Sequence, residues 1–331
     1  MKFLITGGAG FIGSVLTSKI TDSGHQVLVL DSYQFNYDRK PPVTYNSILS
    51  YRFDHLLKAA TIERCSLVEK SLMSRHVEDF KPDVVIHLAA MSLVTVATRH
   101  IEEARGALSD GLINLLEVIR NSKTITRFIY VSSSMVYGDF SSDPMPEDGL
   151  KKPRNIYGGL KLAGEILSQS YLCQTDIECT IVRPSAVYGP TDLHRRVVQN
   201  FCTNALHNLP LTMIESKDNI FDFTYVDDVV EGLFLAATHP AAANEIFNIT
   251  YGKARTLHEL IDVIRLYVPN LTVITQESGD NDRTHRGSLS VKKAKDLLGY
   301  QSKWTLEKAI PVYLDQFSQY FDFFSEVNNE K

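Results

Sequence analysis

Residues 3–13, FLITGGAGFIG, place a short apolar run directly before a turn that holds four glycines. After the turn, apolar residues recur at helical spacing; they are Phe11, Ile12, Val15, Leu16 and Ile20. The stretch therefore predicts a strand, a tight turn and a helix. Such a turn brings backbone N–H groups and the positive end of a helix against a pyrophosphate. Gly7 and Gly10 can adopt backbone angles that a side chain forbids, and Gly13 lets the helix lie close to the strand.

An aspartate at the end of the next apolar run supports a dinucleotide site. Residues 26–30, QVLVL, are typical of a second strand and lead into Asp31, 18 positions after Gly13. A carboxylate at this place can bind both ribose hydroxyls of an adenosine and would repel a 2′-phosphate. The pattern predicts NAD rather than NADP as the cofactor. The alternative is that Asp31 only caps or solvates the end of the strand.

The composition is that of an ordinary soluble globular protein, with 44% hydrophobic and 22% charged residues among 331. A net charge of −5 gives no general attraction to nucleic acid or to an anionic membrane, so neither is expected as a partner. No apolar run approaches the roughly 18 residues that span a bilayer, and the first residues do not resemble a signal peptide. Four cysteines without paired metal spacing indicate reduced thiols in a cytoplasmic protein and no metal site.

The first half of the chain alternates apolar strands with helices. Strands are expected at 62–65, 84–90 and 127–131, and helices at 72–80 and 102–120. This order is typical of an α/β protein with a doubly wound parallel sheet, the Rossmann arrangement. In such sheets ligands bind at the carboxyl ends of the strands.

Three further features belong to this part of the chain. The small residues at 88–90, Leu-Ala-Ala, let a cofactor approach the backbone at a strand end. His87, within the apolar run, fits a core histidine with a satisfied hydrogen bond better than a catalytic group. The long connection 32–60 is expected to contain one helix at 48–57, and it covers the adenine, the substrate or only the surface.

A tyrosine and a lysine one helical turn apart carry the predicted chemistry. Tyr157 and Lys161 open an apolar helix, and positions i and i+4 lie on one helical face. A cation beside the phenol favours the phenolate, so we expect Lys161 to lower the pKa of Tyr157. Such a tyrosine can remove a proton from a sugar hydroxyl while a hydride leaves for a nicotinamide. Ser133, 24 residues earlier at a predicted strand end, would hydrogen-bond the same oxygen.

Over nearly its whole length the sequence resembles the extended short-chain dehydrogenase/reductases of the nucleotide-sugar epimerase/dehydratase family. The matching stretches are 6–13, Asp31, 87–90, 132–138, 157–161, 183–190, 223–228 and 293–300. The resemblance implies Ser133, Tyr157 and Lys161 as catalytic residues. It also implies a homodimer, and a smaller C-terminal α/β lobe that binds a nucleotide sugar. We expect an NAD-binding domain at 1–187 plus 223–250 and a substrate lobe at 188–222 plus 251–331.

These matches give the full set of predicted site residues. The expected NAD-binding residues are Gly7, Gly10, Phe11, Ile12, Gly13, Asp31, Ser32, Leu88, Ala89, Ala90, Tyr157, Lys161 and Pro184. The expected substrate-binding residues are Ser134, Met135, Tyr188, Arg195, Arg283 and Arg286.

Positions at which the sequence departs from the family pattern indicate which of the family's reactions is disfavoured. Dehydratases of the family commonly carry acidic residues where this chain has Ser134 and Met135, so elimination of water is disfavoured. The family often has asparagine where Leu108 and Ala186 stand, and an arginine that grips the diphosphate where Phe221 stands.

Other arginines are candidates to replace the missing one. Arg195, Arg196, Arg283 and Arg286 are suitable, because guanidinium groups bind phosphate oxygens in a bidentate way. For Arg195 and Arg196 a solvated helix start is an equally good interpretation. His194 is expected at the surface, with an acid or base role as the alternative.

The resulting hypothesis is an NAD-dependent epimerase of a nucleotide-activated sugar, acting at C4 through a transient keto sugar. The first alternative is a net oxidoreductase, a ketosugar reductase or sugar dehydrogenase, which would consume free cofactor in each turnover. A 4,6-dehydratase would need an acid from outside the usual positions. A non-enzymatic cofactor-binding protein is disfavoured by the intact Tyr157 and Lys161 pair.

Overall fold

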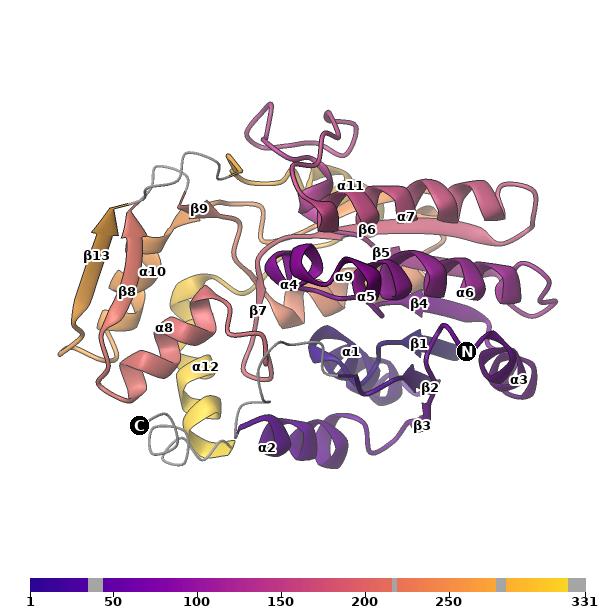
Figure 1. The fold of residues 1–331 in the computed structure, drawn as a ribbon, viewed down its shortest axis with the longest axis horizontal. Helices are drawn as coiled ribbons and strands as arrows, with labels where there is room; N and C mark the ends of the chain where they lie inside the picture. Colours follow the sequence, from indigo (N-terminus) through magenta and orange to yellow (C-terminus); the bar gives the residue numbers. More distant parts are fainter. Residues whose placement is uncertain (35–43, 216–218, 278–283, 321–331) are drawn as a thin grey trace.

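The computed structural model describes residues 1–34, 44–215, 219–277 and 284–320. Its centre is a seven-stranded parallel sheet in the order β11-β6-β5-β4-β1-β2-β3 (Figure 1). The strands are β1 (Lys2–Thr6), β2 (Gln26–Asp31), β3 (Thr61–Arg64), β4 (Val84–His87), β5 (Arg127–Val131), β6 (Glu178–Pro184) and β11 (Ile246–Ile249). The chain adds strands outward from β1 to β3 and then on the other side from β4 onward. The predicted doubly wound parallel sheet is therefore confirmed.

Successive side chains of a central strand pack on opposite layers of helices. Phe3 and Ile5 of β1 belong to the apolar cluster of α1 (Phe11–Asp22) and α9 (Val226–Thr238). Leu4, between them, belongs to the cluster on the other face. That face is covered by α3 (Lys70–Phe80), α6 (Gly111–Ile119) and α7 (Ile156–Leu172), and Figure 1 shows α6 and α7 side by side. Because both faces are covered, the strands are continuously apolar.

A smaller lobe lies beyond the carboxyl ends of the strands, at the left of Figure 1. It contains a parallel pair, β8 (Leu211–Glu215) with β13 (Val273–Glu277), and an antiparallel pair, β9 (Ile220–Phe221) with β12 (Arg255–Thr256). Its helices α8 (Val197–Leu206), α10 (Leu257–Arg265) and α12 (Leu306–Tyr320) contact one another. The short strands β7 (Val187–Tyr188) and β10 (Thr224–Tyr225) pair where the chain leaves and re-enters the central part. The proposed division into two domains stays a prediction.

Two predicted helices differ from the structure. The helix expected at 102–120 is present over 101–119, but its middle is the π-helical segment Gly106–Asp110, which lies between α5 (Ile101–Arg105) and α6. The helix expected at 48–57 is α2 (Thr44–Tyr51) followed by a second π-helical segment, Arg52–Leu56. Such segments admit an extra residue per turn and often occur at functional sites. The remaining helices are α4 (Val94–Arg99) and α11 (Lys292–Leu298).

Two polar residues of the core have structural roles. His87 is 1% exposed, and its Nδ1 lies 2.7 Å from the hydroxyl oxygen of Thr6, which confirms the core interpretation. Asp228 lies in the first turn of α9, and its carboxylate accepts the backbone N–H groups of Lys303 and Trp304. Among the described residues, no helix combines the length and apolar character needed to cross a membrane.

Candidate active site

A cavity of about 390 Å³ lies at the carboxyl ends of β1, β2 and β4. The glycine turn forms one side of it. Gly7 has a φ of +72°, and a Cβ on Gly7 would lie 2.6 Å from the backbone nitrogen of Ala89. A Cβ on Gly13 would lie 2.4 Å from the carbonyl oxygen of Gly7. The predicted cofactor residues on the wall are Gly7, Gly10, Phe11, Ile12, Gly13, Asp31, Ser32, Leu88, Ala89 and Ala90.

Asp31 lies on the cavity wall and also holds the glycine turn. One carboxylate oxygen accepts the N–H of Ala9 at 3.0 Å and the other accepts the N–H of Tyr33 at 2.9 Å. Burial raises the pKa of Asp31, while these hydrogen bonds and the charge of Arg52 act in the opposite direction. The same carboxylate therefore has a structural role as well as the predicted role in ribose binding.

The predicted catalytic residues come together where β5 ends and α7 begins. The side chain of Ser133 acts on the phenol of Tyr157 and is one of the two influences that lower its pKa. Asn155 caps α7 by accepting the N–H of Gly158 at 2.8 Å. A Cβ on Gly158 would lie 2.5 Å from the carbonyl oxygen of Met135, so only glycine lets the helix start this close to the serine turn. Tyr157 and Met135 belong to one apolar cluster, which also packs against Ala90 of the cavity wall.

The electrostatics around Tyr157 differ from the prediction. Burial raises the pKa of Tyr157, and this outweighs the lowering by Arg196 and by the hydrogen bond from Ser133. Lys161 makes no resolved contribution to that pKa. Its ammonium group instead donates to the carbonyl oxygen of Val131 at 2.7 Å, and burial lowers the pKa of Lys161 to about 8. The cation that acts on Tyr157 is therefore Arg196, which was a candidate for the substrate diphosphate but was not expected beside Tyr157.

A buried ion pair joins α7, the helix that carries Tyr157 and Lys161, to β6. Glu165 lies one turn after Lys161 and its charge opposes the lowering of the Lys161 pKa. The guanidinium of Arg183 donates to both carboxylate oxygens of Glu165, at 2.8 and 2.6 Å. Ser132, adjacent to Ser133, donates to the same carboxylate at 2.5 Å. The residues that follow β5 and the helix α7 are thus joined through the carboxylate of Glu165.

Several predicted site residues lie elsewhere. Arg195 is exposed and is not among the residues of the cavity wall. Tyr188 is 2% exposed and packs against the rings of Phe223 and Tyr225, because β7 runs through the core. Pro184 ends β6 and, like Tyr157 and Lys161, does not line the cavity. Arg283 lies outside the described residues.

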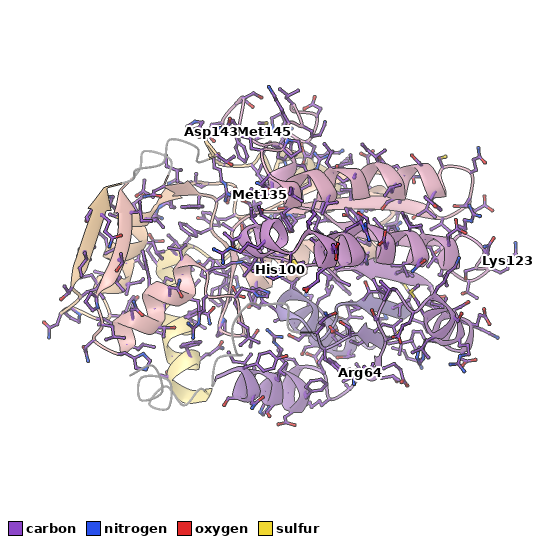
Figure 2. All side chains as sticks on the ribbon, in the orientation of Figure 1. Arg64, His100, Lys123, Met135, Asp143 and Met145 are labelled. Atoms are coloured by element: carbon purple, nitrogen blue, oxygen red, sulfur yellow. The ribbon has the colours of Figure 1, made fainter. Side chains whose placement is uncertain are left out.

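The other predicted substrate residues lie beside the catalytic group, on the side of the smaller lobe. Figure 2 shows Met135 near the start of α7, facing that lobe. The Nη2 of Arg286 lies 3.0 Å from the sulfur of Met135, and the guanidinium stands 5.6 Å from the centre of the Phe221 ring. No carboxylate among the described residues forms an ion pair with Arg286, and burial lowers its pKa. Ser134 is buried and donates to Ser185 at 3.0 Å, so it supports the turn.

Sequence reasoning missed Arg52, which lines the first cavity. Arg196, a candidate for the diphosphate, and His194, for which a surface position was preferred, line the same cavity. His194 is not a surface residue; its Nε2 lies 2.8 Å from the Ser92 hydroxyl, and burial lowers its pKa to about 3. A second cavity, of about 450 Å³, lies between α8 and β8; its lining is mostly apolar and includes Phe201 and Phe221, with asparagines such as Asn200 among the polar residues. The sequence gives no clear signal for Arg52, because Asp54 and His55 stand close to it in the same stretch.

Comparison with known proteins places this site in a family. The sequence profile described as "NAD dependent epimerase/dehydratase family" matches residues 3–250. A UDP-glucose 4-epimerase of Mycolicibacterium smegmatis is 27% identical over 333 residues, which cover 94% of this chain and 96% of that protein.

Two solved structures share the fold over most of the chain. A UDP-glucuronic acid 4-epimerase from Bacillus cereus, in complex with UDP-glucuronic acid and NAD, has a TM-score of 0.86 and 27% identity, and the match covers 96% of this chain and 99% of that one. A UDP-glucose 4-epimerase from Thermotoga maritima, with UDP-glucose, has a TM-score of 0.84, 27% identity and the same two coverages. The chain therefore belongs to the NAD-dependent epimerase/dehydratase family and is an NAD-dependent enzyme of the extended short-chain dehydrogenase/reductase type.

Proposed function

We propose that this enzyme is an epimerase that inverts C4 of a nucleotide-activated sugar through a transient keto sugar. The observation that carries the proposal is the meeting of Ser133 and Tyr157 where β5 ends and α7 begins. Tyr157 belongs to the apolar cluster that packs against Ala90 of the first cavity, and Ser134 and Met135 are the residues that follow Ser133. The pair can move a proton on and off a sugar hydroxyl. Neither Ser134 nor Met135 supplies the carboxylic acid that elimination of water requires.

The first cavity fits the cofactor of the family. Positive φ at Gly7 and the close approach of Gly13 to Gly7 leave room for a pyrophosphate at the start of α1, where backbone N–H groups favour negative charge. Asp31 at the far end of β2 suits a ribose with both hydroxyls free. NAD, when bound there, supplies the hydride acceptor and afterwards the hydride donor.

Side chains of the enzyme would transfer the proton of the C4 hydroxyl. Tyr157, as phenolate, takes the proton of the C4 hydroxyl while the C4–H hydrogen leaves as hydride, which forms the keto sugar. Ser133 donates a hydrogen bond to the same sugar oxygen and keeps it in line with Tyr157. After the keto sugar turns over, hydride returns to the other face of C4, and Tyr157 gives its proton back to the oxygen. No net oxidation results, and protons and electrons balance over the cycle.

Two features favour a substrate whose sugar is attached to a nucleoside diphosphate that the enzyme binds. Arg286 is a half-buried cation without a carboxylate partner among the described residues, and its guanidinium stands over the ring of Phe221. The family commonly has an arginine at the position of Phe221. Phe221 also lines the second cavity, whose polar residues include Asn200 and Asn219. We infer that the diphosphate lies near Arg286 and the nucleoside in the second cavity. The solved relatives hold UDP-glucuronic acid and UDP-glucose.

The alternatives make different demands on the cofactor. A ketosugar reductase or sugar dehydrogenase could use the same Ser133 and Tyr157, but it must exchange NAD in every turnover. A dehydratase would need an acid that Ser134 and Met135 do not provide. A homodimer in the cytoplasm stays a prediction from the resemblance and the composition.

The proposal is tested with purified enzyme to which no cofactor is added. UDP-glucose and UDP-glucuronic acid are offered separately, and the sugar is followed by proton NMR. We expect a C4 epimer of one of them to form until equilibrium, with no NADH released. A product that is reduced or dehydrated, or a requirement for added NADH in proportion to product, would favour an alternative.

Exchange of Arg196 for glutamine should move the pH dependence of this reaction. Arg196 is the strongest influence that lowers the pKa of Tyr157, so its removal raises that pKa further. Tyr157 must lose its proton to act as the base, and the ascending limb of the kcat profile should therefore move to higher pH. The neighbouring Arg195→Gln, at an exposed position, is the matched control and should leave the limb in place. If the limb moved in the Arg195 variant and not in the Arg196 variant, Arg196 would not be the cation that acts on Tyr157.

A further inference from the structure

Arg52 is a buried arginine on the wall of the first cavity. Its side chain is 4% exposed, and it begins the π-helical segment that follows α2. Nη1 donates to the carbonyl oxygen of Ala9 at 2.8 Å, and Nη2 donates to the carbonyl oxygen of Thr191 at 2.5 Å. Within the described part of the chain, Nε has no hydrogen-bond partner and no carboxylate forms an ion pair with the guanidinium. Burial lowers the pKa of Arg52 only to about 10, so the group is charged at neutral pH.

On one side Arg52 fixes the glycine turn. The N–H of Ala9 donates to the carboxylate of Asp31, and the carbonyl of the same residue accepts from Arg52. Two buried, opposite charges therefore hold two consecutive peptide groups of the turn. With its carbonyl oxygen bound to Arg52, the Ala9–Gly10 peptide cannot turn that oxygen toward an anion in the cavity. The turn is thus preorganised for a pyrophosphate before any ligand arrives.

On the other side Arg52 fixes the segment 191–196. This segment lies 139 positions from Arg52 and contributes Leu193, His194 and Arg196 to the cavity wall. The glycine turn and the 191–196 segment are far apart in the sequence, and Arg52 is hydrogen-bonded to both. A single guanidinium therefore joins two separate walls of the cofactor cavity.

We propose that Arg52 is a positioning residue that retains the dinucleotide, as a clamp between the glycine turn and the 191–196 segment and as the fixed positive charge beside the pyrophosphate. Release of the cofactor requires the two walls to separate, and separation breaks two charge-assisted hydrogen bonds. The inference rests on the NAD dependence of the family. It deepens the proposed function, because a closed cycle needs the same NAD to stay bound from one turnover to the next.

The test measures release of NAD from the holoenzyme without any sugar. Protein loaded with isotope-labelled NAD is mixed with excess unlabelled NAD, and the label left on the protein is followed by mass spectrometry after denaturation. Arg52→Met should release label at least about tenfold faster than the wild type, the factor expected when one charge-assisted hydrogen bond is lost. Arg52→Lys keeps the charge but cannot hold both carbonyls, so its rate should lie between the two.

Arg75→Met, at an exposed arginine of α3 outside the cavity, is the matched control and should release NAD at the wild-type rate. All rates are measured well below the melting temperature of each variant, so that a merely structural role of Arg52 does not accelerate release. If Arg52→Met does not fold, the rate of NAD release from Arg52→Lys is compared with the wild type and with Arg75→Met instead. Release from the Arg52 variants at the wild-type rate would overturn the proposal. Because no sugar is present, a failed epimerase assay leaves this result unaffected.

Discussion

Replacing Tyr157 with phenylalanine should lower kcat roughly 100- to 10,000-fold, the range in which a positioned acid or base contributes. The phenol oxygen is the group whose pKa Ser133 and Arg196 lower and that we propose takes the C4 hydroxyl proton. The ring remains and still fills the apolar cluster with Met135, so the fold should be unaffected. NAD content, measured after denaturation, should equal that of the wild type, because Tyr157 does not line the cofactor cavity.

Tyr171→Phe provides the control for this variant. Tyr171 lies on the same helix, α7, and its ring stands 5.8 Å from the guanidinium of Arg120, a contact that phenylalanine preserves. We expect its kcat to match the wild type. A Tyr157→Phe enzyme that keeps its kcat would contradict the assignment of Tyr157 as the base.

Replacing Glu165 with alanine should lower the free energy of unfolding by about 3–5 kcal/mol, the usual effect of removing one partner of a buried ion pair. The side chains of Glu165 and Arg183 are 3% and 1% exposed, so the variant would leave the guanidinium buried without its counter-charge. Ser132 would lose its acceptor as well. The measurement is thermal or urea-induced unfolding of the NAD-loaded protein.

An exposed ion pair gives the comparison for the buried one. Asp262 and Arg265 of α10 pair at 2.8 Å with side chains 69% and 46% exposed. Asp262→Ala should change stability by no more than about 1 kcal/mol, since solvent screens such pairs. A Glu165→Ala variant that loses no more stability than Asp262→Ala would show that the buried pair does not support the catalytic helix.

The features that could be predicted from the sequence depend on local spacing. The glycine turn follows from residues within one strand–turn–helix unit, and Asp31 follows from the next strand. The i, i+4 rule places Tyr157 and Lys161 on one helix. Alternating strands and helices were enough for the parallel sheet, because connection rules leave few ways to wind them.

The features that could not be predicted depend on contacts between distant parts of the chain. Neighbouring arginines at 195 and 196 are alike in sequence, yet the turn before α8 points one to solvent and the other to the cavity. Tyr188 was expected at the substrate, but pairing of β7 with β10 buries it. The pKa of Tyr157 was expected to fall. The cation expected from the spacing, Lys161, has no resolved effect on that pKa; Arg196 lowers it instead, and burial raises it by more.

The central claim, a closed hydride cycle at C4, is tested most directly with a UDP-sugar that carries deuterium at C4. The sugar, UDP-glucose or UDP-glucuronic acid according to which one reacts, is incubated with the purified enzyme in ordinary water without added cofactor. The account predicts a C4 epimer that retains the deuterium, because the hydride that leaves C4 returns to the same carbon. Loss of the deuterium from the product, or a keto sugar that accumulates together with reduced cofactor, would contradict it.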